Sequence, residues 1–175
     1  VLTVGGTSSF TAVGQSITLD SANDFAGALS ASGSQITLRD ATALELGTVN
    51  ATGNLTVTAG GAISDSGVLT VGGAASFAAV GQTITLDSAN DFVGALSASG
   101  SVITLRDATA LDLGAVNATG NLTVTAGGAI SDSSVLTVGG TSSFTAVGQS
   151  ITLDSANDFA GALSASGSQI TLRDA

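Results

Sequence analysis

The segment Ile17-Thr18-Leu19-Asp20-Ser21-Ala22-Asn23-Asp24-Phe25 carries the pattern that decides the fold. Its first three residues alternate apolar, polar and apolar, as expected for a strand with one buried face. A polar turn follows, and Phe25 lies seven residues after Thr18. We expect Ile17, Leu19 and Phe25 to point inward while Thr18 points to solvent.

The same phrase recurs along the whole chain with a fixed internal offset. Its threonines are Thr3, Thr18, Thr37, Thr56, Thr70, Thr85, Thr104, Thr123, Thr137, Thr152 and Thr171. The residues seven places later are all large and apolar: Phe10, Phe25, Leu44, Ile63, Phe77, Phe92, Leu111, Ile130, Phe144 and Phe159. These ten side chains are predicted to stack as a core column, with one threonine phrase for each coil.

A longer repeat contains these phrases. The sequence Val-Leu-Thr-Val-Gly-Gly begins at Val1, Val68 and Val135, and each repeat runs from one of these valines to the next. We divide the chain into repeat 1 (1–67), repeat 2 (68–134) and a partial repeat 3 (135–175) of one continuous solenoid, read as a segment of a longer chain. A fixed period of about 67 residues is typical of solenoid proteins.

The predicted fold is all-β, a right-handed parallel β-helix (β-solenoid) with about four coils per 67-residue repeat. Parallel strands in neighbouring coils lie about 4.8 Å apart, so four coils would advance about 19 Å per repeat. A helical fold is disfavoured because no segment keeps an apolar period of three to four residues over three turns, and glycine interrupts too often. An antiparallel β-sandwich is a stronger alternative, but it would not explain four short equivalent phrases in each repeat.

Composition bears on the function classes. The chain has a net charge of −10, which argues against a nucleic-acid partner because no basic face exists. It also lacks His and Cys. General bases and nucleophiles are limited to carboxylates and hydroxyls that recur identically in each repeat. We therefore expect no catalytic site and no enzyme activity. No apolar run approaches the roughly 18 residues of a membrane helix, so membrane insertion is not expected.

Acidic turns are the only candidate metal sites, and they are weak ones. Carboxylate oxygens suit calcium, and the candidate ligands are Asp20, Asp24, Asp87, Asp91, Asp154 and Asp158. The competing explanation is that Asn and Asp serve the geometry of the turn. The glycine-rich nonapeptide of calcium-binding β-rolls is absent, and no other cofactor is expected.

The only cations are expected to form a surface ladder. Arg39, Arg106 and Arg173 lie two residues after their threonines. The matching positions one coil earlier are Asp20, Asp87 and Asp154. Each pair would form an exposed ion pair worth about 0 to 1 kcal/mol, whose use would be to fix the register.

Two further surface features have ordinary and functional interpretations. The sequences Asn50-Ala51-Thr52 and Asn54-Leu55-Thr56 match the glycosylation sequon, which makes Asn50, Asn54, Asn117 and Asn121 candidate glycosylation sites. The outward threonine column invites an ice-binding hypothesis. Thr also suits any exposed strand position, and chance sequons are common in a chain rich in Asn and Thr.

A family resemblance agrees with the fold. Asn121-Leu-Thr-Val-Thr-Ala-Gly-Gly-Ala-Ile130, Asn90-Asp-Phe-Val-Gly-Ala-Leu96 and Ile103-Thr-Leu-Arg-Asp-Ala-Thr-Ala-Leu111 resemble the repeat regions of filamentous-haemagglutinin-like large exoproteins and adhesins of Gram-negative bacteria. This resemblance implies a long right-handed β-helical rod exported by two-partner or autotransporter secretion. It also implies an extracellular location at the bacterial cell surface.

The leading functional hypothesis is a structural shaft: an adhesin stalk, or a component of a filament or extracellular matrix. A second hypothesis is that the repeats themselves bind glycans or other surface ligands; ice binding ranks below it. The expected partners are further copies of the chain, other surface proteins or glycans. The repeated faces are small, polar and nearly free of the aromatic platforms that glycan sites use, which favours the shaft.

Overall fold

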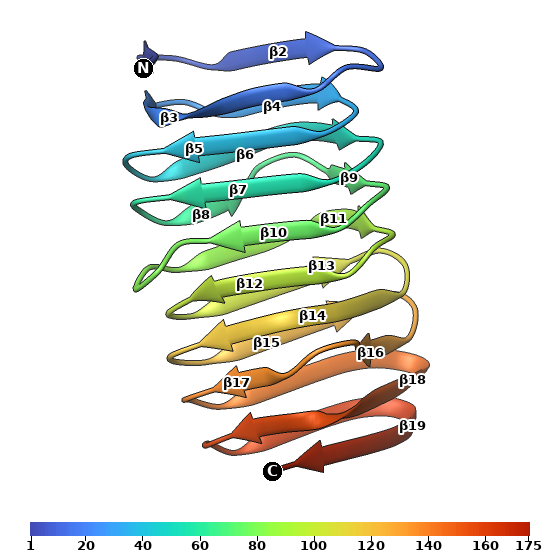
Figure 1. Ribbon diagram of the computed structural model, residues 1–175. Coiled ribbons are helices and arrows are strands. Elements are labelled where there is room, and N and C mark those ends of the chain that lie inside the picture. Colours follow the sequence, from blue (N-terminus) through green and yellow to red (C-terminus); the bar gives the residue numbers. More distant parts are fainter.

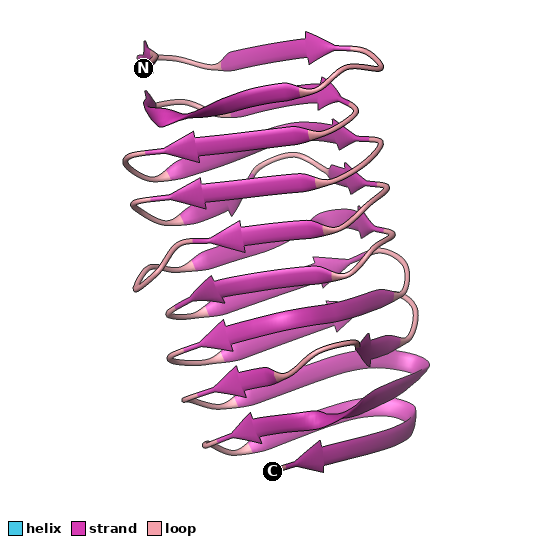
Figure 2. Cartoon of the chain, in the orientation of Figure 1, coloured by secondary structure: helices cyan, strands magenta, loops and turns pink.

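The computed structural model describes all residues from Val1 to Ala175. The chain forms strands and no helix, and it winds into a parallel β-solenoid of about nine turns (Figures 1 and 2). The strands are β1 (Thr3–Val4), β2 (Ser8–Ala12), β3 (Ile17–Phe25), β4 (Leu29–Gly33), β5 (Ile36–Asp40), β6 (Leu44–Ala51), β7 (Leu55–Ala59), β8 (Ile63–Asp65), β9 (Leu69–Val71), β10 (Ala75–Ala78), β11 (Ile84–Phe92), β12 (Leu96–Gly100), β13 (Ile103–Asp107), β14 (Leu111–Ala118), β15 (Leu122–Ala126), β16 (Ile130–Asp132), β17 (Leu136–Val138), β18 (Ser142–Phe159) and β19 (Leu163–Asp174).

Three strand stretches make one turn, as β7, β8 and β9 show. We name the faces that they occupy A, B and C. In the next turn β10 pairs with β7 on face A, the start of β11 pairs with β8 on face B, and the end of β11 pairs with β9 on face C. All of these pairings are parallel. The predicted parallel β-helix is therefore confirmed.

The register of face A gives the length of a turn. Ile17 pairs with Ile36, Ile36 with Leu55, Leu55 with Ala75, and Ala75 with Leu96. Successive partners are thus separated by a nearly constant length of chain, about 20 residues, which parallel ladders require because each rung must lie directly above the one before. This length is the perimeter of one turn.

The predicted count of four coils per repeat is wrong. It required Thr56 to stack on Thr70, but Thr56 pairs with Ser76, and Thr70 pairs with Asn50 and Asp91. The stretches from Thr56 to Thr70 and from Thr70 to Thr85 are too short to complete a turn, so these threonines lie on different faces. A repeat of about 67 residues makes about 3.3 turns, and its expected rise is about 16 Å instead of about 19 Å.

Equivalent residues of successive repeats consequently lie on different faces. Ile17 lies on face A, paired with Ile36. Ile84 lies on face B, between Ile63 and Ile103. Ile151 lies on face C, between Ile130 and Ile170. Each repeat holds ten strand stretches and three make a turn, which leaves one stretch over and shifts each repeat by one face.

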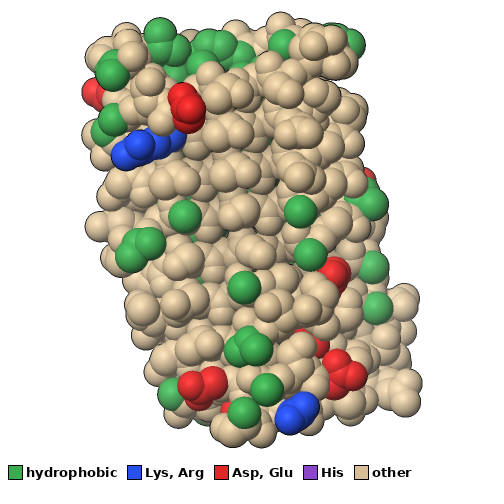
Figure 3. Space-filling view, in the orientation of Figure 1, with side chains coloured by type: hydrophobic (Ala, Val, Ile, Leu, Met, Phe, Trp, Pro, Cys, Tyr) green, Lys and Arg blue, Asp and Glu red, His purple; other side chains and the backbone are tan.

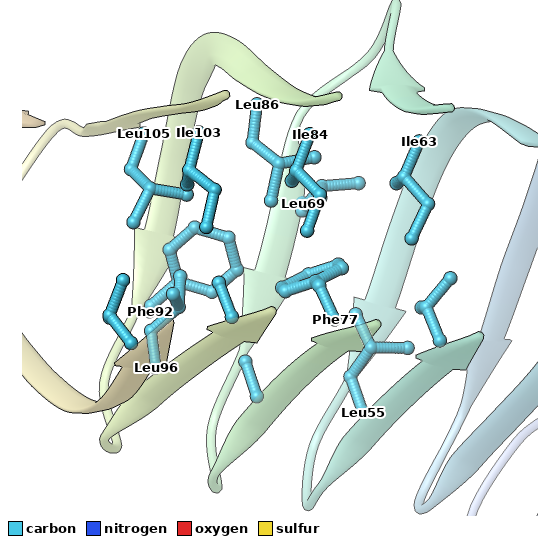
Figure 4. Packing of buried hydrophobic residues seen from close by; sticks show 14 of the residues in the cluster. Leu55, Ile63, Leu69, Phe77, Ile84, Leu86, Phe92, Leu96, Ile103 and Leu105 are labelled. Atoms are coloured by element: carbon cyan, nitrogen blue, oxygen red, sulfur yellow. The ribbon is translucent and has the colours of Figure 1, made fainter. Parts of the chain in front are cut away.

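The interior holds one continuous cluster of 41 buried apolar residues. Nine of the ten residues expected in the core column are buried, and Phe10, in the first turn, is partly buried. They do not form a single column, however. Leu44 pairs with Ile63 as expected, but Ile63 pairs with Ile84 and not with Phe77. Figure 4 shows Ile63, Ile84 and Ile103 in a row along successive turns, with the two phenylalanines below them.

The phenylalanines of each repeat instead meet across the core. The Phe77 and Phe92 rings lie 6.0 Å apart at 80°, an edge-to-face contact that recurs for Phe10 with Phe25 and for Phe144 with Phe159. Such contacts stabilise a fold by about 0.5 to 1.5 kcal/mol beyond the stabilisation that comes from the apolar area they bury. Each contact therefore joins two walls of the interior, as Phe77 on face A and Phe92 on face C show.

Candidate functional site

The short polar segment after the threonine phrase of β11 forms a β-bulge, and buried polar side chains bond the backbone around it. Between β11 and β13 the register shifts, because Leu86 pairs with Leu105 and the next paired residue is Asn90, opposite Asp107. The segment 87–89 is thereby left out of the ladder. Asn90 and Asp107, only 0% and 2% exposed, lie in the wall beside this bulge.

Asn90 joins two earlier segments of the chain to the bulge. Its Oδ1 accepts the backbone N–H of Leu69 at 2.8 Å, and its Nδ2 donates to Asp65 Oδ2 at 2.7 Å. Asp65 Oδ1 in turn accepts the backbone N–H of Asp87 at 3.0 Å. Backbone donors that the bulge removes from the ladder are thus bonded to side chains, as buried polar groups require.

The same arrangement recurs in the third repeat and differs in the first. Asn157 accepts from Leu136 and donates to Asp132 with the same distances of 2.8 and 2.7 Å. Asn23 accepts from Leu2 but donates to the carbonyl oxygens of Leu19 and Arg39. Asp65 and Asp132 were not among the candidates from sequence, although each recurs at a fixed distance before its asparagine.

A second buried carboxylate holds the far side of the bulge. Asp107 Oδ2 accepts the Phe92 backbone N–H at 2.8 Å, and Oδ1 accepts the backbone N–H and the hydroxyl of Thr109 at 2.6 and 2.9 Å. Asp40 makes the equivalent bonds to Phe25 and Thr42. Burial desolvates the Asp107 carboxylate and raises its pKa, while the donors from Phe92 and Thr109 oppose that rise.

The calcium candidates do not converge on a common centre. Asp20, Asp87, Asp154 and Asp158 are exposed, and Asp24 and Asp91 are half-buried. Asp91 accepts the Thr109 hydroxyl at 3.1 Å. No group of three or more His, Cys, Asp or Glu side chains has an arrangement that could hold a metal ion. Of the turn residues, the asparagine bonds the backbone, as Asn90 does with Leu69, whereas Asp24 and Asp91 accept threonine hydroxyls.

The predicted arginine–aspartate ladder does not form between side chains. Arg106 Nη1 donates to the backbone carbonyl of Asp87 at 3.4 Å, and not to its carboxylate. The register shift explains this, since Asp87 begins the bulge and so is not held opposite Arg106. Charged side chains are few and scattered on the face that Figure 3 shows.

The four candidate glycosylation residues are all exposed, but they differ in their contacts. Asn54 Oδ1 accepts the Ala74 N–H of the next turn at 3.0 Å, and Asn121 Oδ1 accepts that of Thr141 at 2.9 Å. These two amides therefore link successive turns. Asn50 and Asn117 lie on β6 and β14 with their side chains exposed.

One shallow hollow of about 310 Å³ lies on face A. It spans β10, β12, the end of β14 and the segment before β17, and its polar lining includes Ser76, Ser97, Ser99, Asn117 and Thr137. Ala78 and Ala115 also line it, where repeat 1 has the larger Thr11 and Thr48. The hollow carries no charged side chain.

The repeats match one protein family. A family described as repeats of unknown function (DUF5649) matches residues 1–32, 33–99 and 99–166. The chain belongs to this family. No curated protein and no solved structure matches the chain.

The DUF5649 matches follow the period read from the sequence, since the match to residues 33–99 has the length of one repeat. Each such length holds one bulge of the kind found between Leu86 and Asn90, with its buried asparagine. The structure contains no helix that could cross a membrane. Within the DUF5649 repeat, the buried polar residues thus have a structural role in closing the wall of the solenoid.

Proposed function

We propose that this chain is part of a structural shaft in a long extracellular fibrous protein at a bacterial cell surface. The observation that carries the proposal is the unbroken stack of about nine turns around one continuous core. Each turn contacts only its neighbours, so adding repeats lengthens such a stack without altering its cross-section. The resemblance to large exoproteins and adhesins supports the location and the role as an adhesin stalk or matrix component.

The polar groups that could have formed a site are used within the wall. Asp65 accepts a backbone N–H of the bulge, and Asn90 and Asp107 accept the backbone N–H groups of Leu69 and Phe92, so these side chains join neighbouring stretches of the wall. This use supports a mechanical role, because an asparagine at this position bonds neighbouring segments in every repeat, with the same partners in repeats 2 and 3. Further copies of the chain, other surface proteins and glycans are the proposed partners.

Rod length tests the shaft directly. Additional copies of residues 68–134 can be inserted after residue 134, because Val135 restarts the repeat. The shaft predicts straight rods that lengthen by about 16 Å per inserted repeat in electron micrographs. Particles that stay globular, or whose length does not follow the repeat number, would contradict it. Immunogold labelling of intact source cells tests the location, since unlabelled surfaces would exclude it.

Ligand binding by the repeats is the second candidate, and the hollow on face A favours it. Its hydroxyl and amide groups could bond a sugar, but aromatic side chains that face outward are lacking around it. A glycan array probed with the chain separates the two functions. Binding that is lost in Ala115→Thr, which puts into the hollow the larger side chain that repeat 1 has at Thr48, would support binding over a purely structural shaft. The ice-binding hypothesis is weaker, because the threonine column of face A continues at Ser76 after Thr56.

A further inference from the structure

The length of the sequence repeat is not a whole number of solenoid turns, so equivalent protruding loops of successive repeats lie at different corners. Val13 lies between β2 on face C and the start of β3 on face A. Val80 lies between β10 on face A and the start of β11 on face B, and Val147 lies between the face B and face C stretches of β18. These three equivalent valines are 82%, 80% and 77% exposed, so each marks a different corner of the solenoid.

The acidic turns follow the same rule. The segment 20–22 lies between faces A and B, the segment 87–89 between B and C, and the segment 154–156 between C and A. The aspartate of each such segment, Asp20, Asp87 or Asp154, is therefore placed on a new corner. The net charge of −10 is distributed around the molecule instead of along one side.

We infer that the chain displays its surface as a threefold screw, in which each repeat is rotated by one third of a turn and raised by about 16 Å. A given feature returns to the same corner only after three repeats, which corresponds to about ten turns and about 48 Å. This extends the proposed shaft, because a shaft of identical repeats then has three equivalent sides.

The screw determines the kind of partner that the surface fits. A partner lying along one side meets a given feature once in about 48 Å, whereas partners that each contact one repeat find equivalent sites on all three sides. The surface therefore fits partners that each contact a single repeat and together surround the rod, such as neighbouring copies in a bundle. It does not fit one partner whose binding sites follow a straight line.

Spin-label distances test the screw in the whole chain. The variants Val13→Cys with Val80→Cys, Val80→Cys with Val147→Cys, and Val13→Cys with Val147→Cys place labels on exposed loops. The screw predicts equal distances for the first two pairs and a third distance well short of twice that value. A third distance equal to twice the first would place the loops in line and overturn the screw, while leaving the shaft intact.

A control pair and a binding count complete the test. Labels at Thr18 and Ser97, four turns apart on face A, should lie about 19 Å apart. A broad distribution for this pair would overturn the fold beneath both proposals. With biotin on all three valine positions, native mass spectrometry should count three monovalent streptavidins per chain. Saturation at fewer than three would contradict sites on separate sides.

Discussion

At the residue scale, the wall of the solenoid depends on a few buried polar side chains. Asp107 lies outside the acidic turn and was not a candidate from sequence. Asn90 and the aspartates of its turn were within reach of sequence analysis, since they recur in each repeat. Their role was not, because turns that bind a cation and turns that bond their own backbone have the same composition. Asp65 was missed because only the length of a turn brings it to Asn90, 25 residues away.

Ser142 offers a substitution that should stabilise the chain. Its hydroxyl is buried without a hydrogen-bond partner, and the equivalent residue of repeat 2 is Ala75, which is 1% exposed. Ser142→Ala removes the unsatisfied group without leaving a large cavity, so we expect the free energy of unfolding to rise by about 1 kcal/mol. Urea unfolding measures it, with the half-exposed Ser143→Ala as the control. A loss of stability would show that the Ser142 hydroxyl has a partner after all.

Asp107 should give the chain a pH-dependent stability. Its pKa is raised in the folded state, mainly because burial disfavours the carboxylate. The group therefore stabilises the fold most below its unfolded pKa, and that contribution is lost as pH rises through the higher folded pKa.

The control for this prediction is Asp107→Asn, which cannot titrate at this position. The urea midpoint of the native chain should fall relative to that of Asp107→Asn as pH rises from about 3 to 7. If the native midpoint instead rises relative to that of Asp107→Asn over the same range, the hydrogen bonds from Phe92 and Thr109 outweigh burial, and the pKa of Asp107 is lowered.

At the scale of the strands, the sequence predicted the local pattern well and the stacking only in part. The threonine phrases at Thr18, Thr37 and Thr56 do pair in successive turns, because their spacing equals one perimeter. The next phrase, at Thr70, follows Thr56 too closely for a ladder to close between them. Equal motifs suggested equal positions, whereas the requirement for a constant perimeter decides which residues stack.

Disulfide formation distinguishes the two registers. Paired strands place opposed residues about 4.8 Å apart, within the separation that a disulfide needs. The chain with Thr56→Cys and Ser76→Cys should oxidise to an intramolecular disulfide, seen by thiol titration. Thr56→Cys with Thr70→Cys is the matched control and should remain reduced under the same conditions. Rapid oxidation of the control pair alone would restore the register of four coils per repeat.

Glycine positions report on contact between turns. A Cβ on Gly73 would meet Asn54 Oδ1 and lie 2.8 Å from the carbonyl carbon of Gly53 in the preceding turn, so Gly73→Ala should cost about 1 to 3 kcal/mol. Gly6 is the equivalent residue of repeat 1, and nothing lies within 4 Å of its Cβ position. Gly6→Ala should therefore change the urea midpoint little. Equal losses in both variants would mean that backbone conformation, and not contact between turns, determines the effect.

At the scale of the whole molecule, near-identical repeats build a rod by nearest-neighbour contacts alone. Each turn contributes apolar side chains to one continuous core and ladder bonds to the turns on either side. The first and last turns lack one such neighbour, and Ile170 and Leu172 of the last turn are 43% and 39% exposed. Repetition in the sequence predicted this architecture. The rise per repeat could not be predicted, because it depends on the number of residues in one turn, and the spacing between threonine phrases does not always equal that number.

The axial repeat of the extended protein tests the central claim most directly. Cryo-electron microscopy of chains lengthened with copies of residues 68–134 should show a spacing of about 4.8 Å between turns and a rise of about 16 Å per repeat. These two values together mean about 3.3 turns for each repeat. A rise of about 19 Å would restore four coils per repeat, and particles without the spacing of about 4.8 Å would contradict the solenoid itself.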